Sequence, residues 1–120
     1  MKVIEIIIDL TNPNGKPSFN FYDVTKETEN YLHSTGEEFW QRGRRFFKRS
    51  IDQVHYPKKL VYTYQFKTDI EDYFEIEKSE QMQKAMRELR QTIKRELDYY
   101  QRHFECVFNY YDKNYKEDKE

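Results

Sequence analysis

Val3-Ile4-Glu5-Ile6-Ile7-Ile8-Asp9-Leu10 is the most regularly patterned segment of this 120-residue chain. The even positions from Ile4 to Leu10 are all apolar, whereas Glu5 and Asp9 fall on the opposite face of an extended chain. Successive side chains of a β-strand point to opposite faces, so this alternation predicts a half-buried strand. Such a strand needs neighbouring strands and an apolar layer over one face.

Two β-hairpins are predicted from similar patterns. Residues 11–17 hold Asn14-Gly15 between two prolines, and alternation resumes over Ser18–Val24, which predicts a hairpin with the first strand. The segment Leu60–Phe66 alternates again, and Tyr73–Lys78 does so after a polar turn. We therefore expect a second hairpin there.

Two helices are predicted between the hairpins. A short helix is expected over Thr25–His33. A longer one is expected to begin near Gly36, after a capping box of Thr35 and Glu38, and to end at Pro57. On a helical wheel its aromatic residues share one side and its cations the other. We expect an aromatic core face back to back with a basic surface.

A long amphipathic helix is predicted from Ser79 onward, because apolar residues advance by threes and fours without Gly or Pro. They are Met82, Met86, Leu89, Ile93, Leu97, Tyr100, Phe104, Val107, Phe108 and Tyr111. Such a helix is roughly 50 Å long, whereas a compact chain of this size is about 35 Å across. We expect the helix to overhang, to bend or to find a partner, and a homodimer through this helix is one hypothesis.

The predicted fold class is α+β, in the order ββα-ββα. An antiparallel sheet of about four strands would be packed on one face by the mid-chain helix and the long C-terminal helix. Residues 1–112 are expected to form a single domain, and residues 113–120 a charged, frayed tail.

Composition limits the function classes. The net charge is −1, 18% of residues are aromatic and the mean hydropathy is −1.14, so we expect a folded cytoplasmic protein with no membrane contact. The single cysteine, Cys106, excludes an internal disulfide framework. The sequence has no phosphate loop, nucleophile elbow or metal-spaced Cys/His set, so we expect no enzyme, cofactor or metal.

The strongest functional signal is the segment Gln41–Arg49, which places five cations around two phenylalanines. Clustered guanidinium groups bind phosphates and acidic surfaces through paired hydrogen bonds. The predicted binding residues are Arg42, Arg44, Arg45, Lys48 and Arg49. An alternative is that this face is simply solvated, or is paired with the acidic segment of Asp69, Glu71, Asp72, Glu75 and Glu77.

The long helix supplies further interface candidates. Tyr99 and Tyr110 share a flank of the helix, and tyrosine is enriched at protein interfaces. Arg95 and Arg102 complete this predicted set, although salt bridges along the helix explain most of its charges.

Three functional hypotheses follow. The first is a small non-enzymatic regulator or inhibitor that binds a host protein or nucleoprotein complex. Because the composition is Ala-poor and Lys-, Asn- and Tyr-rich, it is placed in a phage or mobile element, for example as an anti-CRISPR-type inhibitor. The second is a direct binder of RNA or single-stranded DNA that uses the basic segment 41–49 with its flanking tyrosine and phenylalanine side chains. The third is an enzyme whose site the sequence spacing conceals.

Overall fold

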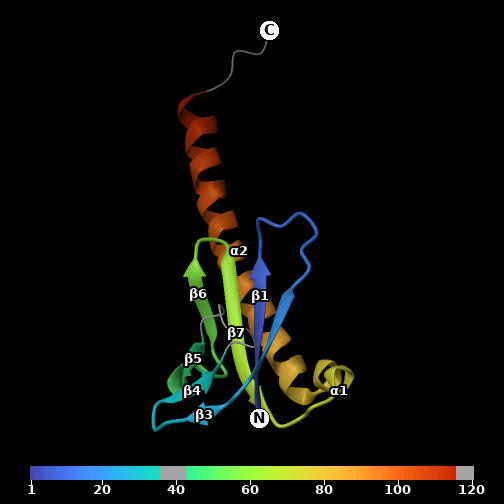
Figure 1. Ribbon diagram of the computed structural model, residues 1–120. Coiled ribbons are helices and arrows are strands. Elements are labelled where there is room, and N and C mark those ends of the chain that lie inside the picture. Colours follow the sequence, from blue (N-terminus) through green and yellow to red (C-terminus); the bar gives the residue numbers. More distant parts are fainter. Residues whose placement is uncertain (36–42, 116–120) are drawn as a thin grey trace. The chain divides into compact units, whose positions relative to one another are not determined.

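The computed structural model describes residues 1–35 and 43–115 (Figure 1). The chain divides into two compact units, residues 1–89 and 90–120. In the described residues, the elements run β1, β2, β3, β4, β5, a 3-10 turn η1, β6, β7, α1 and α2. None of the helices within these ranges is long and apolar enough to cross a membrane.

A four-stranded antiparallel sheet forms the centre of the first unit. Its strands β1 (Lys2–Asp9), β2 (Ser18–Asp23), β6 (Val54–Lys58) and β7 (Val61–Thr68) lie in the order β2-β1-β7-β6. The predicted first hairpin is confirmed, since β1 pairs antiparallel with β2. The predicted Leu60–Phe66 strand is confirmed as β7, and the α+β class with a four-stranded sheet is also confirmed.

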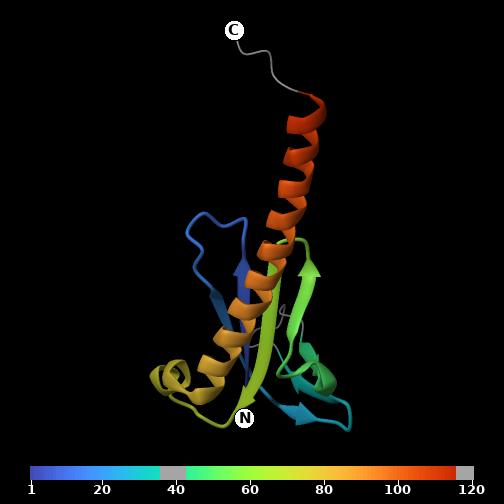
Figure 2. The same ribbon diagram turned by 180° about the vertical axis from the view of Figure 1, so that it is seen from behind.

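The even-numbered face of this sheet carries the main core. Ile4 pairs with Phe66 and Ile6 with Tyr64, and all four side chains are buried. The first turns of α2 (Glu80–Asn114) lie along this face (Figure 2) and bury a stripe at helical spacing. That stripe consists of Met82, Ala85 and Leu89.

Tyr64 and Glu88 link the sheet to α2. Burial raises the pKa of the Tyr64 phenol well above its usual range, and the nearby carboxylates of Glu88 and Asp52 raise it further. Tyr64 therefore remains neutral and shares a side-chain hydrogen bond with Glu88. The predicted long C-terminal helix is confirmed as one element. Its first turn is capped by Ser79, whose Oγ accepts a hydrogen bond from the Met82 N–H at 3.2 Å.

A second, three-stranded sheet packs against the odd-numbered face of the first. Its strands β3 (Lys26–Glu27), β4 (Tyr31–Ser34) and β5 (Arg44–Phe47) are antiparallel neighbours in that order. A small core of Val3, Leu32 and Phe46 joins the two sheets. Because this core is apolar on both sides, it holds β5 over one end of β1.

The predicted helix over Thr25–His33 was wrong, because the segment forms β3 and β4. Residues 28–30 make the turn, closed by a hydrogen bond from the Thr28 N–H to the Tyr31 carbonyl at 2.9 Å. Leu32 then points into the small core. Alternating burial from Tyr31 to Ser34 is the signature of a strand, and tertiary packing selected it.

The predicted mid-chain helix was also wrong where the chain is described. Arg44–Phe47 is β5, η1 spans Lys48–Ser50, and Val54–Lys58 is β6. Pro57 does not end a helix but lies in β6, an outer strand of the large sheet, where a missing N–H is tolerated. The expected helix start near Gly36, with its Glu38 cap, lies outside the described residues.

The predicted strand at Tyr73–Lys78 was wrong and is the helix α1 instead. Asp72 explains the difference, because its side chain accepts hydrogen bonds from the N–H groups of Phe74 and Glu75 and so caps a helix. Only Ile76 of the predicted apolar face is buried, whereas Phe74 is exposed. The ββα-ββα order is therefore replaced by strands first and helices last.

The packing of α2 on the sheet can be tested at Leu89, which is fully buried. We expect Leu89→Ala to lower the free energy of unfolding by about 2–5 kcal/mol, because it leaves a cavity. The matched control is Lys84→Ala, an exposed position of the same helix where alanine is tolerated. Urea denaturation of both variants measures this, and equal stability would contradict the packing of α2.

Candidate functional site

Glu5 is a buried carboxylate on the odd-numbered face of the large sheet. It is 3% exposed and lies on β1 between Asn20 of β2 and Gln65 of β7, its partners in strand register. The side-chain amides of both neighbours donate to it, Gln65 at 2.8 Å and Asn20 at 3.3 Å. A carboxylate so far from water requires a cation as well.

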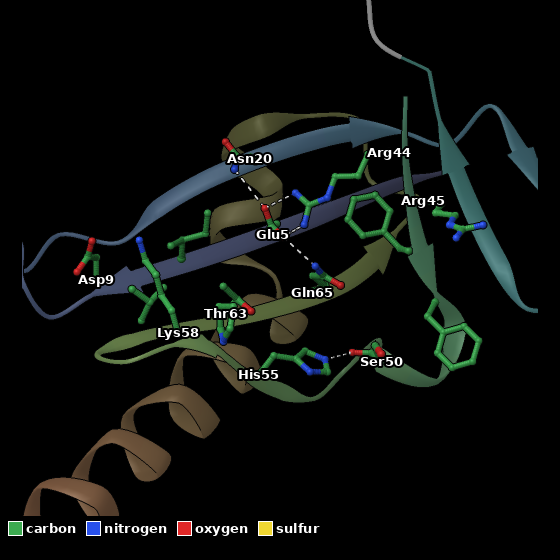
Figure 3. A pocket seen from close by; sticks show the side chains of 15 residues that line it. Glu5, Asp9, Asn20, Arg44, Arg45, Ser50, His55, Lys58, Thr63 and Gln65 are labelled. Atoms are coloured by element: carbon green, nitrogen blue, oxygen red, sulfur yellow. Dashed lines mark hydrogen bonds and ion pairs between the residues drawn. The ribbon is translucent and has the colours of Figure 1, made fainter. Parts of the chain in front are cut away.

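Arg44 supplies that cation from β5 of the small sheet. Its Nη1 donates to Glu5 Oε1 at 2.6 Å, and its Nη2 donates to Oε2, so the pair is bidentate. The Tyr22 hydroxyl accepts a further hydrogen bond from Nη1 at 2.8 Å. The guanidinium also lies over the rings of Tyr22 and Phe46, 5.1 and 4.9 Å from their centroids. Figure 3 shows Arg44 reaching across to Glu5.

The pKa of Glu5 reflects two opposing causes. Burial by itself would raise it, but hydrogen bonds from Arg44, Gln65 and Asn20 and the charge of Arg44 hold it below its usual value. The pKa of Arg44 is raised, chiefly by its hydrogen bond to Glu5. Both groups therefore stay charged at neutral pH.

A hollow of about 680 Å³ opens beside this ion pair (Figure 3). Its floor is the odd-numbered face of the large sheet, and β5 and η1 form one wall. His55 hydrogen-bonds the Ser50 carbonyl at 2.7 Å across this wall. Asp9 lies at the other end with Lys58, and the Thr11 hydroxyl and N–H lower the pKa of Asp9. The hollow thus carries both signs of charge beside apolar side chains such as that of Val61.

The hydrogen-bonding capacity of Glu5 is already used by protein groups. In the part of the chain that the structure describes, no group of three or more His, Cys, Asp or Glu side chains is placed to hold a metal ion. The Glu5–Arg44 pair accordingly serves to fix β5 over the sheet. The surface that β5 presents on its other side is the more promising candidate site.

The outer face of the small sheet consists of the side chains of β3–β5 that point away from the core. These are Lys26, Tyr31, His33, Arg45 and Phe47, and the adjacent Arg49 joins them.

Aromatic rings and cations are interleaved on the outer face. Tyr31 and Phe47 are paired in register, with ring centroids 5.2 Å apart. The Arg45 guanidinium lies 4.7 Å from the centroid of the Tyr31 ring, and that of Arg49 lies 5.1 Å from the Phe47 ring. Next to them, Lys26, His33 and Arg45 form a row across the three strands. This combination can stack on flat unsaturated groups and neutralise phosphates.

The structure separates the predicted basic residues instead of gathering them on one helical face. Arg44 is paired with Glu5, and Lys48 forms an ion pair with Glu27 at 2.7 Å. Arg45 and Arg49 lie on the outer face, whereas Arg42 falls outside the described residues. The prediction of one basic helical face was therefore wrong, since neighbouring side chains of a strand diverge. Figure 3 shows Arg44 and Arg45 leaving β5 on opposite sides.

The described residues also do not show the alternative, in which the basic residues pair with the acidic segment Asp69–Glu77. Arg44 and Lys48 pair with Glu5 and Glu27, and Glu71 lies 3.6 Å from Lys2. The helix candidates Tyr99, Tyr110, Arg95 and Arg102 are all exposed on α2. Cys106 is an exposed free thiol.

Sequence reasoning missed Lys26, Tyr31 and His33 as site residues. They were assigned to a predicted helix, where they would not share a face with Arg45. The available signal was the alternation in Tyr31-Leu32-His33-Ser34, where the apolar Leu32 lies between two residues with polar groups. This segment is β4, and it pairs antiparallel with Arg44-Arg45-Phe46-Phe47 of β5. Comparisons of the chain with protein-family models, with curated proteins and with solved structures found no match.

The Glu5–Arg44 pair can be tested by removing its cation. We expect Arg44→Ala to destabilise the fold by about 2–3 kcal/mol, because breaking a buried pair costs about 3–5 kcal/mol and Arg44 is partly exposed. The control Arg45→Ala, on the opposite side of β5, should cost less than about 1 kcal/mol. Equal losses, measured by urea denaturation, would contradict the role of the pair.

The same pair predicts a pH dependence. The pKa of Glu5 is lower in the folded than in the unfolded chain, so its stabilisation is present above the unfolded value of about 4.5 and is lost as the pH falls through the folded value. Wild type and Glu5→Gln should therefore differ most at neutral pH and converge in acid. Denaturation curves at neutral and acidic pH measure this, and a constant difference would exclude a charged Glu5 as the cause.

Proposed function

We propose that this chain is a small non-enzymatic binding protein that contacts RNA or single-stranded DNA through the outer face of the small sheet. The observation that carries the proposal is the Tyr31–Phe47 ring pair with the guanidinium groups of Arg45 and Arg49 lying over its rings. Unpaired bases stack on aromatic rings and on guanidinium planes, whatever their sequence.

The charges of the outer face support this function. Its cationic or protonatable side chains are Lys26, His33, Arg45 and Arg49, and no outward position of β3–β5 is acidic. Glu27, the acidic residue of β3, is paired in register with the inward-facing Leu32 and forms an ion pair with Lys48. The outer face is therefore locally positive, although the net charge of the whole chain is −1. Phosphate contacts there would release counterions and make binding salt-dependent.

The size of the surface suits a short contact. The paired rings offer stacking to one or two bases, each worth roughly 1–3 kcal/mol. Three or four phosphates neutralised on a single strand give a slope of roughly −2 to −3 for log affinity against log salt. Moderate, sequence-tolerant and salt-sensitive binding is the expected behaviour.

The binding prediction is tested with a fluorescent single-stranded oligouridylate. We expect Arg45→Glu plus Arg49→Glu to weaken binding at least tenfold in about 50 mM salt, because two phosphate contacts are lost and two repulsions are added. Tyr31→Ala should weaken binding by about fivefold or more through lost stacking. Fluorescence anisotropy titrations at about 50 and about 200 mM salt measure both effects.

The matched control is Lys84→Glu plus Arg87→Glu, which changes the net charge by the same amount at exposed positions of α2. If this control weakens binding as much as Arg45→Glu plus Arg49→Glu, net charge and not the outer face causes the effect. Wild-type protein that does not bind the strand even at low salt would overturn the proposal.

A second candidate is a regulator of a host nucleoprotein machine, for example an anti-CRISPR-type inhibitor encoded by a phage or mobile element. It is favoured by Tyr99 and Tyr110 of α2, which are 68% and 58% exposed and suit a protein partner. The outer face of such a regulator would bind the nucleic-acid strand that the host nucleoprotein complex holds.

A cleavage assay with a purified guide-loaded CRISPR nuclease separates the two candidates. An inhibitor should block cleavage of target DNA near a one-to-one ratio and lose potency on Tyr99→Ala plus Tyr110→Ala. Binding to the free oligonucleotide with no effect on cleavage would favour the direct nucleic-acid binder.

A further inference from the structure

The second unit carries an apolar seam on α2 that the described structure leaves uncovered. Its members follow one another at spacings of four, three, four, three and four residues, and they are Ile93, Leu97, Tyr100, Phe104, Val107 and Tyr111. Leu97 is 52% exposed, Phe104 55% and Tyr111 56%. Alternating steps of three and four place these residues at the a and d positions of heptads, with Leu97, Phe104 and Tyr111 at a.

The area of this seam matches what a dimer needs. Tyr100 and Val107 are 36% and 37% exposed, and Ile93 is half-buried. Taking about 200 Å² for an aromatic side chain and about 150 Å² for an aliphatic one, the six side chains present roughly 500 Å² per copy. Two seams together would bury roughly 1,000 Å², the size that a specific interface must reach. Large exposed apolar surfaces on a polar chain mark interaction sites.

We propose that the apolar seam pairs with the same seam of a second copy of this chain, with the two helices antiparallel. This inference is independent of the proposed contact with nucleic acid. It rests on the heptad spacing, the exposed area and the residues at the ends of the seam.

The antiparallel register pairs two aromatic side chains at the centre of the seam and a bulkier with a smaller side chain toward its ends. When Tyr100 packs against Phe104 of the second copy, Leu97 faces Val107 and Ile93 faces Tyr111. In such a pairing each a residue of one helix faces a d residue of the other, so every layer of the seam is apolar. Bulky residues opposite smaller ones fill an interface without voids.

Charge selects the antiparallel over the parallel arrangement. Arg90 occupies the a position preceding Leu97, so a parallel pair would place it against Arg90 of the second copy, a repulsive contact. In the antiparallel register Arg90 faces Asn114 of the second copy, an uncharged hydrogen-bonding group. Lys94 would lie beside Phe108 of the second copy, where an ammonium group is favoured by the aromatic face.

The first experiment measures mass by light scattering coupled to size exclusion over a wide concentration range. We expect wild type to form a dimer that Leu97→Glu plus Phe104→Glu converts to a monomer, because two acids in each seam oppose pairing. The control Gln91→Glu plus Asn109→Glu adds the same charges at exposed positions outside the seam and should remain dimeric. Circular dichroism verifies that both variants stay helical.

The second experiment tests orientation by oxidative cross-linking in a Cys106→Ser background. Leu97 and Val107 are ten residues apart, about 15 Å along the helix, too far for a disulfide within one chain. An antiparallel dimer should cross-link only when Leu97→Cys and Val107→Cys are combined, whereas a parallel dimer would cross-link through each single cysteine. Cross-linking by single variants, or a wild type that is monomeric at every concentration, would overturn the proposal.

Discussion

The burial of Glu5 is the constraint on which the arrangement of the two sheets depends. A carboxylate removed from water on an inner strand costs several kcal/mol unless a cation and hydrogen-bond donors meet it. Strand neighbours provide two amide donors, but the cation comes from Arg44, 39 positions away in the chain. The small sheet must therefore lie where Arg44 can reach, and the core of Val3, Leu32 and Phe46 holds it there.

The outer face follows from the same constraint. Once Arg44 and Phe46 point inward, the two-residue period of a strand directs Arg45 and Phe47 outward. A slip of one residue would bury Arg45 and expose Phe46, so the register is strongly specified. One structural ion pair thus orders a surface of rings and cations on the opposite side of β5. In the proposed function, the buried pair positions the binding surface without touching the nucleic acid.

The helix α2 shows a different relation between pattern and use. Its apolar residues advance by threes and fours from Met82 to Tyr111, yet only Met82, Ala85 and Leu89 are buried. Helical periodicity indicates that one face of the helix is apolar, but it does not indicate what covers that face. In the first unit the sheet covers it, and in the second we assign the cover to another copy of the chain.

The sequence alone determined the elements whose pattern is long or unambiguous. The β1 alternation, the first hairpin, the strand that begins near Leu60 and the long helix from Ser79 each offered many residues of one period. Local pattern was enough there, because backbone geometry and the burial of one face select the same structure.

Only the tertiary structure decided the short segments. Arg44-Arg45-Phe46-Phe47 fits a helical wheel and a strand equally well, and Thr25–His33 and Tyr73–Lys78 are similarly ambiguous. A contact with a remote residue or a helix cap selected the structure of each segment. Glu5 binds Arg44, the small core contains Leu32, and Asp72 caps α1. The candidate site lies on the first two of these segments. Its geometry could not be read from the sequence, because the free energy that selects it comes from partners remote in the chain.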